Sequence, residues 1–244
     1  MGKYFSWEEF ASVFPRIVQR IPTTLWITFA SFALGIALAL ILAVIRLYRV
    51  PVLNQIAVLY VSFMRGTPIL IQLLICNIAM PGLIYSLTKV NVGRLWPPIY
   101  FVVIAYAFNS AAFLSEIFRS AVSGVDAGQS EAAYAVGMTK LQAFFKVIFP
   151  QAAFIALPSL ANSLSNLLKD TSLAFSAAGI LDVMGMVSAS AARTFRYLEG
   201  YVGAAIVFFA LCILVEMIFG VLSRRMSHAA RRKALPAVRP AAGE

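Results

Sequence analysis

The sequence is poor in charge, cysteine and histidine, and each scarcity excludes a class of protein. Charged residues make up 12% of the 244 residues, whereas soluble domains carry about 25%. Two cysteines, Cys76 and Cys212, and one histidine, His228, are too few for a disulfide framework or a metal site. The motifs HExxH, GxSxG and GxxxxGK(S/T) are absent, so nothing indicates zinc, serine hydrolase or ATP-binding chemistry. We therefore expect no metal and no cofactor.

What the sequence has in abundance is apolar residues in long uncharged runs. Hydrophobic residues make up 61% of the chain and the mean hydropathy is +0.85, more apolar surface than a soluble body of this size can bury. A bilayer core about 30 Å thick is spanned by about 20 apolar residues of helix. We predict an all-α integral membrane protein with five transmembrane helices, at residues 21–45, 55–80, 95–116, 148–170 and 200–223.

The charged residues lie mostly outside these spans and predict the limits and orientation of the chain. Residues 1–20 are predicted to be an N-terminal interfacial segment, 21–223 a transmembrane domain with a loop at 117–147, and 224–244 a basic tail. A net charge of +10 on a soluble chain would suggest nucleic acid, but Lys and Arg here cluster at span ends and would meet the lipid bilayer. Eleven of them fall on one side of the membrane and seven on the other. The richer side is predicted to be cytoplasmic, with the N-terminus outside and the C-terminus inside.

Polar side chains at membrane depth are costly and usually face a cavity or a partner. Three predicted spans carry them three, four or seven residues apart, which places them on one helix face. The second span is also interrupted after Arg65 by Gly66, Thr67 and Pro68, which we interpret as a break within one span facing a solute path. The alternatives are a structural kink and polar contacts that only tie helices together. The candidate path residues are Thr67, Gln72, Asn109, Asn162, Asn166 and Lys169.

The 117–147 loop contains features of a docking surface. Glu131, Ala132 and Ala133 favour helix, whereas Gly137 suits a turn or a close backbone approach. The pattern predicts a short helix–turn–helix with an exposed acid along the membrane face. Such a surface suits a soluble partner, and an ordinary amphipathic connector is the alternative.

Five motifs occur in order: Arg65-Gly66-Thr67-Pro68 with Gln72; Ala112-Phe113-x2-Glu116-x2-Arg119; Gly128-Gln129-x-Glu131-Ala132-Ala133-x3-Gly137 with Val147-x-Phe149-Pro150; Pro150-Gln151-Ala152; and Lys169-Asp170-Thr171-Ser172-Leu173. The third resembles the EAA loop of ABC transporter permeases, and the set resembles the polar amino acid branch of that family, the histidine, glutamine, arginine and cystine type. Val147, Phe149 and Phe113 depart from the residues usual in the family, which puts only local packing in question.

The resemblance implies the fold of a type I ABC importer permease in the bacterial cytoplasmic (inner) membrane, which is not itself an enzyme. A cytoplasmic ABC ATPase dimer would dock on Glu131, Ala132, Ala133 and Gly137. A second permease subunit, the same or related, and an extracytoplasmic solute-binding protein would complete the assembly. It would move a polar amino acid by ATP-coupled alternating access, and the 109–113 stretch favours cystine or a similar substrate. A stand-alone secondary carrier or channel, and a membrane scaffold that transports nothing, are the alternatives.

Overall fold

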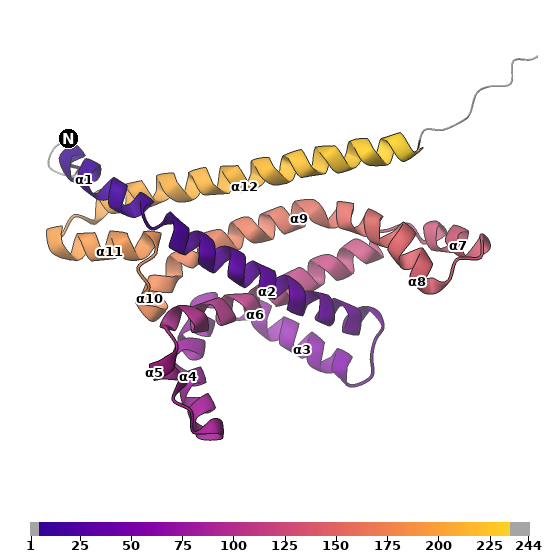
Figure 1. Ribbon diagram of the computed structural model, residues 1–244, viewed down its shortest axis with the longest axis horizontal. Helices are drawn as coiled ribbons and strands as arrows, with labels where there is room; N and C mark the ends of the chain where they lie inside the picture. Colours follow the sequence, from indigo (N-terminus) through magenta and orange to yellow (C-terminus); the bar gives the residue numbers. More distant parts are fainter. Residues whose placement is uncertain (1–4, 235–244) are drawn as a thin grey trace, which may run out of the picture.

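A computed structural model describes the backbone of residues 5–234 and the side chains of residues 5–226, and this part of the chain contains helices and no strand. Figure 1 shows their arrangement. The α-helices are α1 (Trp7–Val18), α2 (Ile21–Leu47), α3 (Leu53–Gly66), α4 (Ile69–Thr88), α5 (Val92–Leu95), α6 (Pro98–Ser123), α7 (Ala127–Ala135), α8 (Lys140–Ala143), α9 (Phe149–Asp170), α10 (Ala174–Ala178), α11 (Val183–Thr194) and α12 (Tyr197–Ala234). A π-helical turn at Phe144–Ile148 joins α8 to α9, and a 3-10 turn at Thr171–Leu173 joins α9 to α10.

The described residues contain five helical stretches that are long and apolar enough to cross a membrane, as predicted. They are Trp7–Leu47, Ile69–Thr88, Pro98–Ser123, Lys140–Ala178 and Tyr197–Met226. The all-α membrane fold expected from the sequence is therefore confirmed. The lengths differ in detail: α6 continues to Ser123, so the first turns of the predicted 117–147 loop belong to that helix. The backbone of α12 extends into the predicted tail as far as Ala234, and residues 235–244 lie outside the described part.

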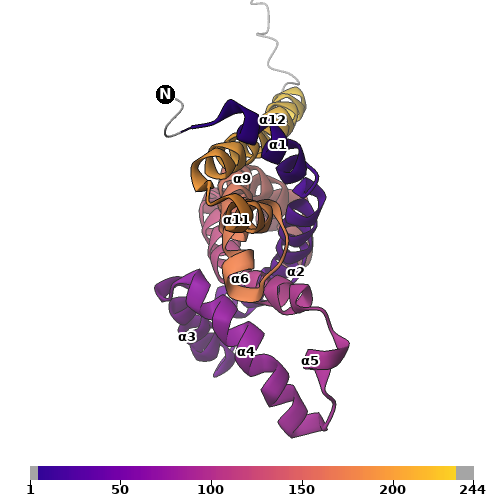
Figure 2. The ribbon, with the colours of Figure 1, turned by 90° about the vertical axis from the view of Figure 1, so that its left-hand side faces the viewer.

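The predicted second span, 55–80, is wrong in its limits. The chain forms two helices here, and only α4 is long and apolar enough to cross a membrane. Thr67 is extended (φ −113°, ψ 142°) and Pro68 precedes the first turn of α4, because the residue before a proline is pushed out of the helical region. The chain changes direction here: α4 packs against α6 near its start and then points away from the bundle, while α3 stays beside α2 and α6 (Figures 1 and 2).

The core lies where α2, α6 and α9 meet. A Cβ atom added to Gly35 of α2 would lie 2.9 Å from the Cβ of Ser110 and 3.3 Å from the carbonyl oxygen of Ala107, so only glycine allows α2 this close to α6. The Ser31 hydroxyl donates to the Val103 carbonyl across the same contact at 3.3 Å. Small residues and short hydroxyls at such contacts are typical of membrane helix packing.

The two ends of the bundle are built differently. At one end α1 packs against α11 and α12, with Val13 and Ile17 buried against Val183, Val187 and Val207. Within the predicted interfacial segment 1–20, residues 7–18 therefore form a helix packed on the bundle, and Pro15 lies inside α1 without ending it. At the other end α7, α8 and the π-helical turn fold back toward the start of α9 (Figure 1).

Candidate functional site: a polar cavity and a hairpin

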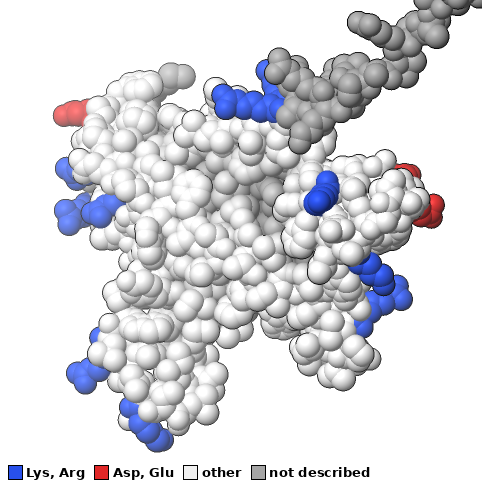
Figure 3. Space-filling model, turned by 45° about the vertical axis from the view of Figure 1, so that its right-hand side comes forward, with Lys and Arg blue, Asp and Glu red and all other residues white. Residues whose placement is uncertain are grey.

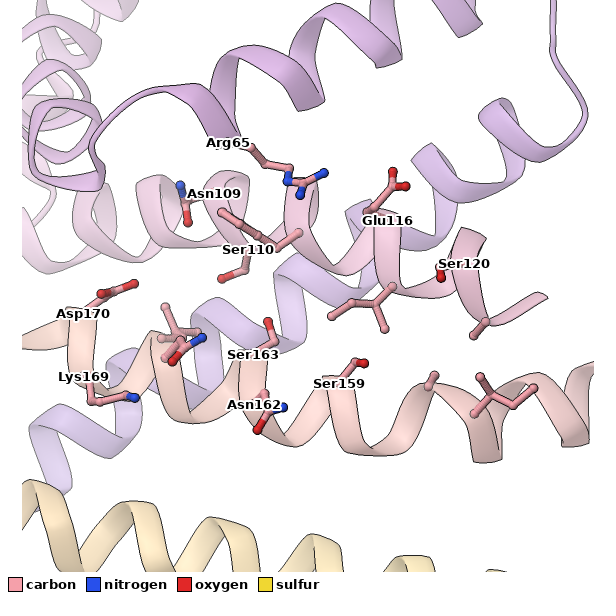
Figure 4. A pocket seen from close by; sticks show the side chains of 17 residues that line it. Arg65, Asn109, Ser110, Glu116, Ser120, Ser159, Asn162, Ser163, Lys169 and Asp170 are labelled. Atoms are coloured by element: carbon pink, nitrogen blue, oxygen red, sulfur yellow. The ribbon is translucent and has the colours of Figure 1, made fainter. Parts of the chain in front are cut away.

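A cavity of about 760 Å³ lies between α3, α6 and α9 (Figure 4). Its polar and charged lining residues are Arg65 from α3, Asn109, Ser110, Glu116 and Ser120 from α6, and Ser159, Asn162, Ser163, Asn166, Lys169 and Asp170 from α9. A cavity with mixed polar and charged groups at membrane depth can hold water and a polar solute.

The α9 wall follows directly from the spacing of its residues. Ser159, Asn162, Asn166 and Lys169 are three or four positions apart and line the cavity together, as the predicted stripe requires. The opposite face of α9 buries Leu164 and Leu168 in the core. Asn162 and Asn166 are exposed and form no hydrogen bond with the side chains and backbone described here, which leaves both amides available to a solute.

The α6 wall joins the cavity to the α3–α4 break. The Asn109 amide donates to Gln72 Oε1 at 2.9 Å. Gln72 Nε2 in turn donates to Thr67 Oγ1 at 2.7 Å and to the Met64 carbonyl at 2.9 Å. Of the candidate path residues, Asn109, Asn162, Asn166 and Lys169 therefore line the cavity, whereas Thr67 and Gln72 line a neighbouring apolar groove instead. Their contacts are those of residues that hold the break in place.

Arg65, which was not among the candidate path residues, lies on the cavity wall (Figure 4). Its guanidinium carbon is 5.5 Å from the centre of the Phe113 ring, a cation–π distance. Arg65 and Gln72 are seven residues apart, a spacing that puts two residues on one face of a continuous helix. Only Arg65 reaches the cavity, because the chain turns between them.

Glu116 is neutralised by two arginines at one end of the cavity. Arg46 of α2 reaches one carboxylate oxygen at 2.6 Å, and Arg119 pairs with the other. Arg119 is three residues away on the same helix, a spacing at which opposite charges commonly pair. The Arg46 contact joins residues 70 positions apart, and no local pattern could have found it.

The predicted helix–turn–helix is a hairpin at residues 126–146. Asp126 caps α7 by accepting from the Gly128 amide at 2.9 Å, and Gly137 ends it with φ +82°. The amides of Gly137 and Met138 donate to the Tyr134 and Ala133 carbonyls, the Schellman arrangement that favours glycine. The expectation of a turn at Gly137 is confirmed.

The hairpin exposes most of its proposed docking residues. Glu131, Ala132 and Gly137 are exposed, and Ala133 is buried. Beside them Val136, Leu141 and Phe145 are exposed to 73%, 69% and 62%. In Figure 3 most Lys and Arg side chains lie toward the edges of the view, and the broad middle of this face is uncharged, as expected of a protein that crosses a membrane.

Comparisons with known proteins agree on the type of protein. The profile of the family described as "Binding-protein-dependent transport system inner membrane component" matches residues 12–228. The chain is 38% identical over 226 residues to the L-cystine transport system permease protein TcyL of Bacillus subtilis (strain 168), covering 93% of each chain. It is also 38% identical over 221 residues to the probable amino-acid permease protein YxeN of the same organism, covering 91% of this chain and 96% of the relative.

Solved structures share the fold. The chain matches a protein in the crystal structure of an amino acid ABC transporter with histidines at a TM-score of 0.79 and 28% identity, over 91% of this chain and 99% of that one. An inward-facing structure of the MetNI methionine ABC transporter matches at a TM-score of 0.68 and 18% identity, over 86% of this chain and 95% of that one. The second likeness concerns the fold alone.

Proposed function

The chain belongs to the family of binding-protein-dependent transport system inner membrane components, and on that premise we propose how it moves its substrate and which residues take part. It is a multi-pass inner-membrane permease subunit of an amino acid ABC importer, not an enzyme, and ATP hydrolysis belongs to a separate subunit. The substrate, path, docking residues and orientation that follow are proposals.

The substrate proposed is L-cystine or a similar polar amino acid, and the α3–α6–α9 cavity is its path. Two relatives that span nearly the whole chain are named L-cystine transport permeases, at 38% and 34% identity. The observation that carries the path is the row of unpaired polar side chains on α9, because Asn162 and Asn166 have no structural task in the described chain. Asn109 and Lys169 complete the proposed lining, and Thr67 and Gln72 support it through Asn109.

The hairpin is the proposed coupling element. Glu131, Ala132, Ala133 and Gly137 would contact a cytoplasmic ATPase dimer, because the neighbouring apolar side chains are exposed and the proposed orientation puts this end in the cytoplasm. Nucleotide-dependent contacts there would shift the bundle between two states, since a ligand shifts an equilibrium only by its differential affinity for them. This is alternating access.

The remaining parts of the assembly follow the same premise. A second permease subunit, identical or related, and an extracytoplasmic solute-binding protein would complete the importer. The N-terminus would lie outside and the C-terminus in the cytoplasm, with residues 1–20 as the N-terminal segment, 21–223 as the permease domain and 224–244 as the tail.

The test is uptake of labelled L-cystine by proteoliposomes that contain the full complex, binding protein and enclosed ATP. We expect uptake to require ATP, and the Asn162→Leu/Asn166→Leu double variant to lower its rate at least about tenfold, because the path loses its polar groups. The matched Asn162→Ser/Asn166→Ser variant keeps polarity and should retain more activity. Unchanged uptake in the Leu variant would reject the path, and ATP-independent uptake driven by an ion gradient would favour the secondary carrier.

A further inference from the structure

Arg65 is a charged side chain in the cavity with no counter-ion in the described structure. It lies in the last turn of α3 and is exposed on the cavity wall. Its contact is the Phe113 ring, at 5.5 Å from the guanidinium carbon, and that ring is itself partly exposed. No described carboxylate lies within salt-bridge distance of Arg65. The three ion pairs among the described residues involve Arg46, Arg119 and Arg196 instead.

The nearest acidic group along the α6 wall is already engaged. Both oxygens of Glu116 are taken by Arg46 and Arg119. Asp170 lies on the other wall, on α9 (Figure 4). Burying an arginine without an ion pair at membrane depth costs free energy unless the side chain faces water or a ligand. The position of Arg65 in the cavity is therefore suited to an anionic ligand.

The backbone that carries Arg65 is held firmly. Gln72 Nε2 donates to the Met64 carbonyl, one residue before Arg65, and to the Thr67 hydroxyl, two residues after it. Gln72 is locked to α6 by the bond from Asn109. The end of α3 is thus tied to both α4 and α6, which fixes the base of the Arg65 side chain while leaving its guanidinium free of hydrogen bonds. Such preorganisation lowers the entropy lost when a ligand binds.

A guanidinium presents a planar fork of donors that matches a carboxylate, and an aromatic face behind it keeps the fork oriented. Every α-amino acid carries a carboxylate. We propose that Arg65 binds the carboxylate of the transported amino acid in the cavity, with Phe113 holding the guanidinium in place. This inference rests on the proposed function and adds the chemical group by which the substrate is recognised inside the permease.

The test measures binding to the detergent-purified permease–ATPase complex without the solute-binding protein, which would impose its own selectivity. Labelled L-cystine, L-glutamine, L-arginine and L-histidine are compared, and the amino acid that binds most tightly is then measured against its α-amide, which has similar size but no negative charge. We expect the wild type to prefer the acid by about 10- to 100-fold, the range of a charge-assisted contact.

In Arg65→Gln, affinity for the acid should fall about 10- to 100-fold, while affinity for the amide changes less than about threefold, so the preference disappears. Arg65→Lys keeps the charge without the fork and should retain part of the preference. The control Arg193→Gln removes an exposed arginine of α11, outside the cavity, and should keep the full preference. The thermal stability of each complex is measured alongside.

The results distinguish a failure of the Arg65 proposal from a failure of the proposed function. A preserved preference in Arg65→Gln, or an equal loss for acid and amide, would overturn the role of Arg65 and leave the importer assignment standing. If no amino acid binds the wild-type complex, the proposed path through the cavity fails and this inference fails with it.

Discussion

The two ends of the bundle, which lie on opposite sides of Figure 1, both expose large apolar side chains, such as Phe195 and Val136, but only one of them buries carboxylates. At the α1–α11 end, formed by α1, α11 and the first turns of α12, even carboxylates are buried: Glu199 is 1% exposed and Asp182 0%. Glu199 accepts from the Ser6 amide at 2.8 Å and from Arg196 at 3.1 Å. The hairpin at the other end leaves large apolar side chains uncovered.

We call the α1–α11 end, which buries carboxylates and an apolar cluster, the finished end, and the hairpin, whose described residues form no such cluster, the unfinished end. The α1–α11 end buries Glu199 against groups of the same chain and packs Val13 and Ile17 in an apolar cluster. The hairpin has well-formed caps at Asp126, Thr139 and Gly137 but little apolar cover of its own. A rigid backbone that presents uncovered apolar residues is what a docking surface for another protein requires.

The largest expected effect breaks the packing of the finished end. Gly200 of α12 lies so close to α11 that an added Cβ would be 2.7 Å from Val187 Cγ1, and Val187 is fully buried. Gly200→Leu should lower the free energy of unfolding by about 3 kcal/mol or prevent folding, because the helices cannot separate without exposing the cluster. The melting temperature of the purified complex measures this.

Gly220→Leu is the matched control on the same helix, since a Cβ there meets nothing within 4 Å. It should leave the melting temperature close to that of the wild type. Equal melting temperatures for the two variants would show that the α1–α11 end is looser than its packing indicates.

The second effect is a pH dependence at the same end. Burial raises the pKa of Asp182 from 3.8 to about 6; one carboxylate oxygen caps α11 by accepting from the Gly185 amide at 2.7 Å, and the other has no partner in the described structure. The folded state therefore holds this proton more tightly than the unfolded state, so stability falls as pH rises from about 4 to about 6 and is level above that.

Asp182→Asn keeps the cap and removes the charge, so this slope should disappear. Above pH 6 the variant should exceed the wild type by at most about 3 kcal/mol. Melting temperatures between pH 4.5 and 7.5 measure the slope, with Asp126→Asn, the exposed cap of α7, as control. A slope that persists in Asp182→Asn would assign it to another group.

The third effect tests the unfinished end. Glu131→Trp and Gly137→Leu place bulk on the proposed docking surface, and leucine at φ +82° is also strained by about 1–2 kcal/mol. We expect association with the ATPase subunits, measured by co-purification, to weaken at least about 30-fold, as at an interface hot spot. Membrane insertion should change little in either variant, and the melting temperature should fall only in Gly137→Leu, by the few degrees that this strain produces.

Gly137→Asn is the control for the hairpin, because asparagine tolerates the left-handed conformation that leucine resists. It should retain most of the ATPase. Normal co-purification and uptake in Glu131→Trp and Gly137→Leu would count against the hairpin as the docking element.

The smallest effect concerns the buried charge of Glu199. Glu199→Gln retains an acceptor for the Ser6 amide but loses the charge that strengthens its bond with Arg196. We expect a loss of about 1 kcal/mol, because Arg196 is itself 43% exposed and partly screened. If the ion pair is the cause, Arg196→Gln should lower the free energy of unfolding by a similar amount. A much larger decrease in Glu199→Gln alone would show that Glu199 acts mainly by anchoring α1 through the Ser6 amide.

Local patterns predicted the features that depend on one helix or one turn. The five apolar stretches follow from length and composition, the α9 stripe from helical spacing, and the turn at Gly137 from the conformational freedom of glycine. The Glu116–Arg119 pair is also local, since its partners are one turn apart.

Thr67 and Gln72 mark the limit of such patterns. Proline after an extended residue predicts that the helix breaks, but the direction the chain takes afterwards depends on what α4 packs against. The amides of Gln72 and Asn109 meet only because α4 and α6 cross at that point. The same change of chain direction puts Arg65 on the cavity wall and Gln72 in the neighbouring groove.

Composition and periodicity by themselves determined that this chain crosses a membrane five times with a polar face on α9 and a turning loop near its middle, because apolar length and helical spacing are properties of consecutive residues. Only the tertiary structure decided which polar groups share one cavity, which tie helices together, and that Glu116 meets Arg46. Those outcomes depend on distances between residues far apart in the chain, which packing sets and no local pattern contains.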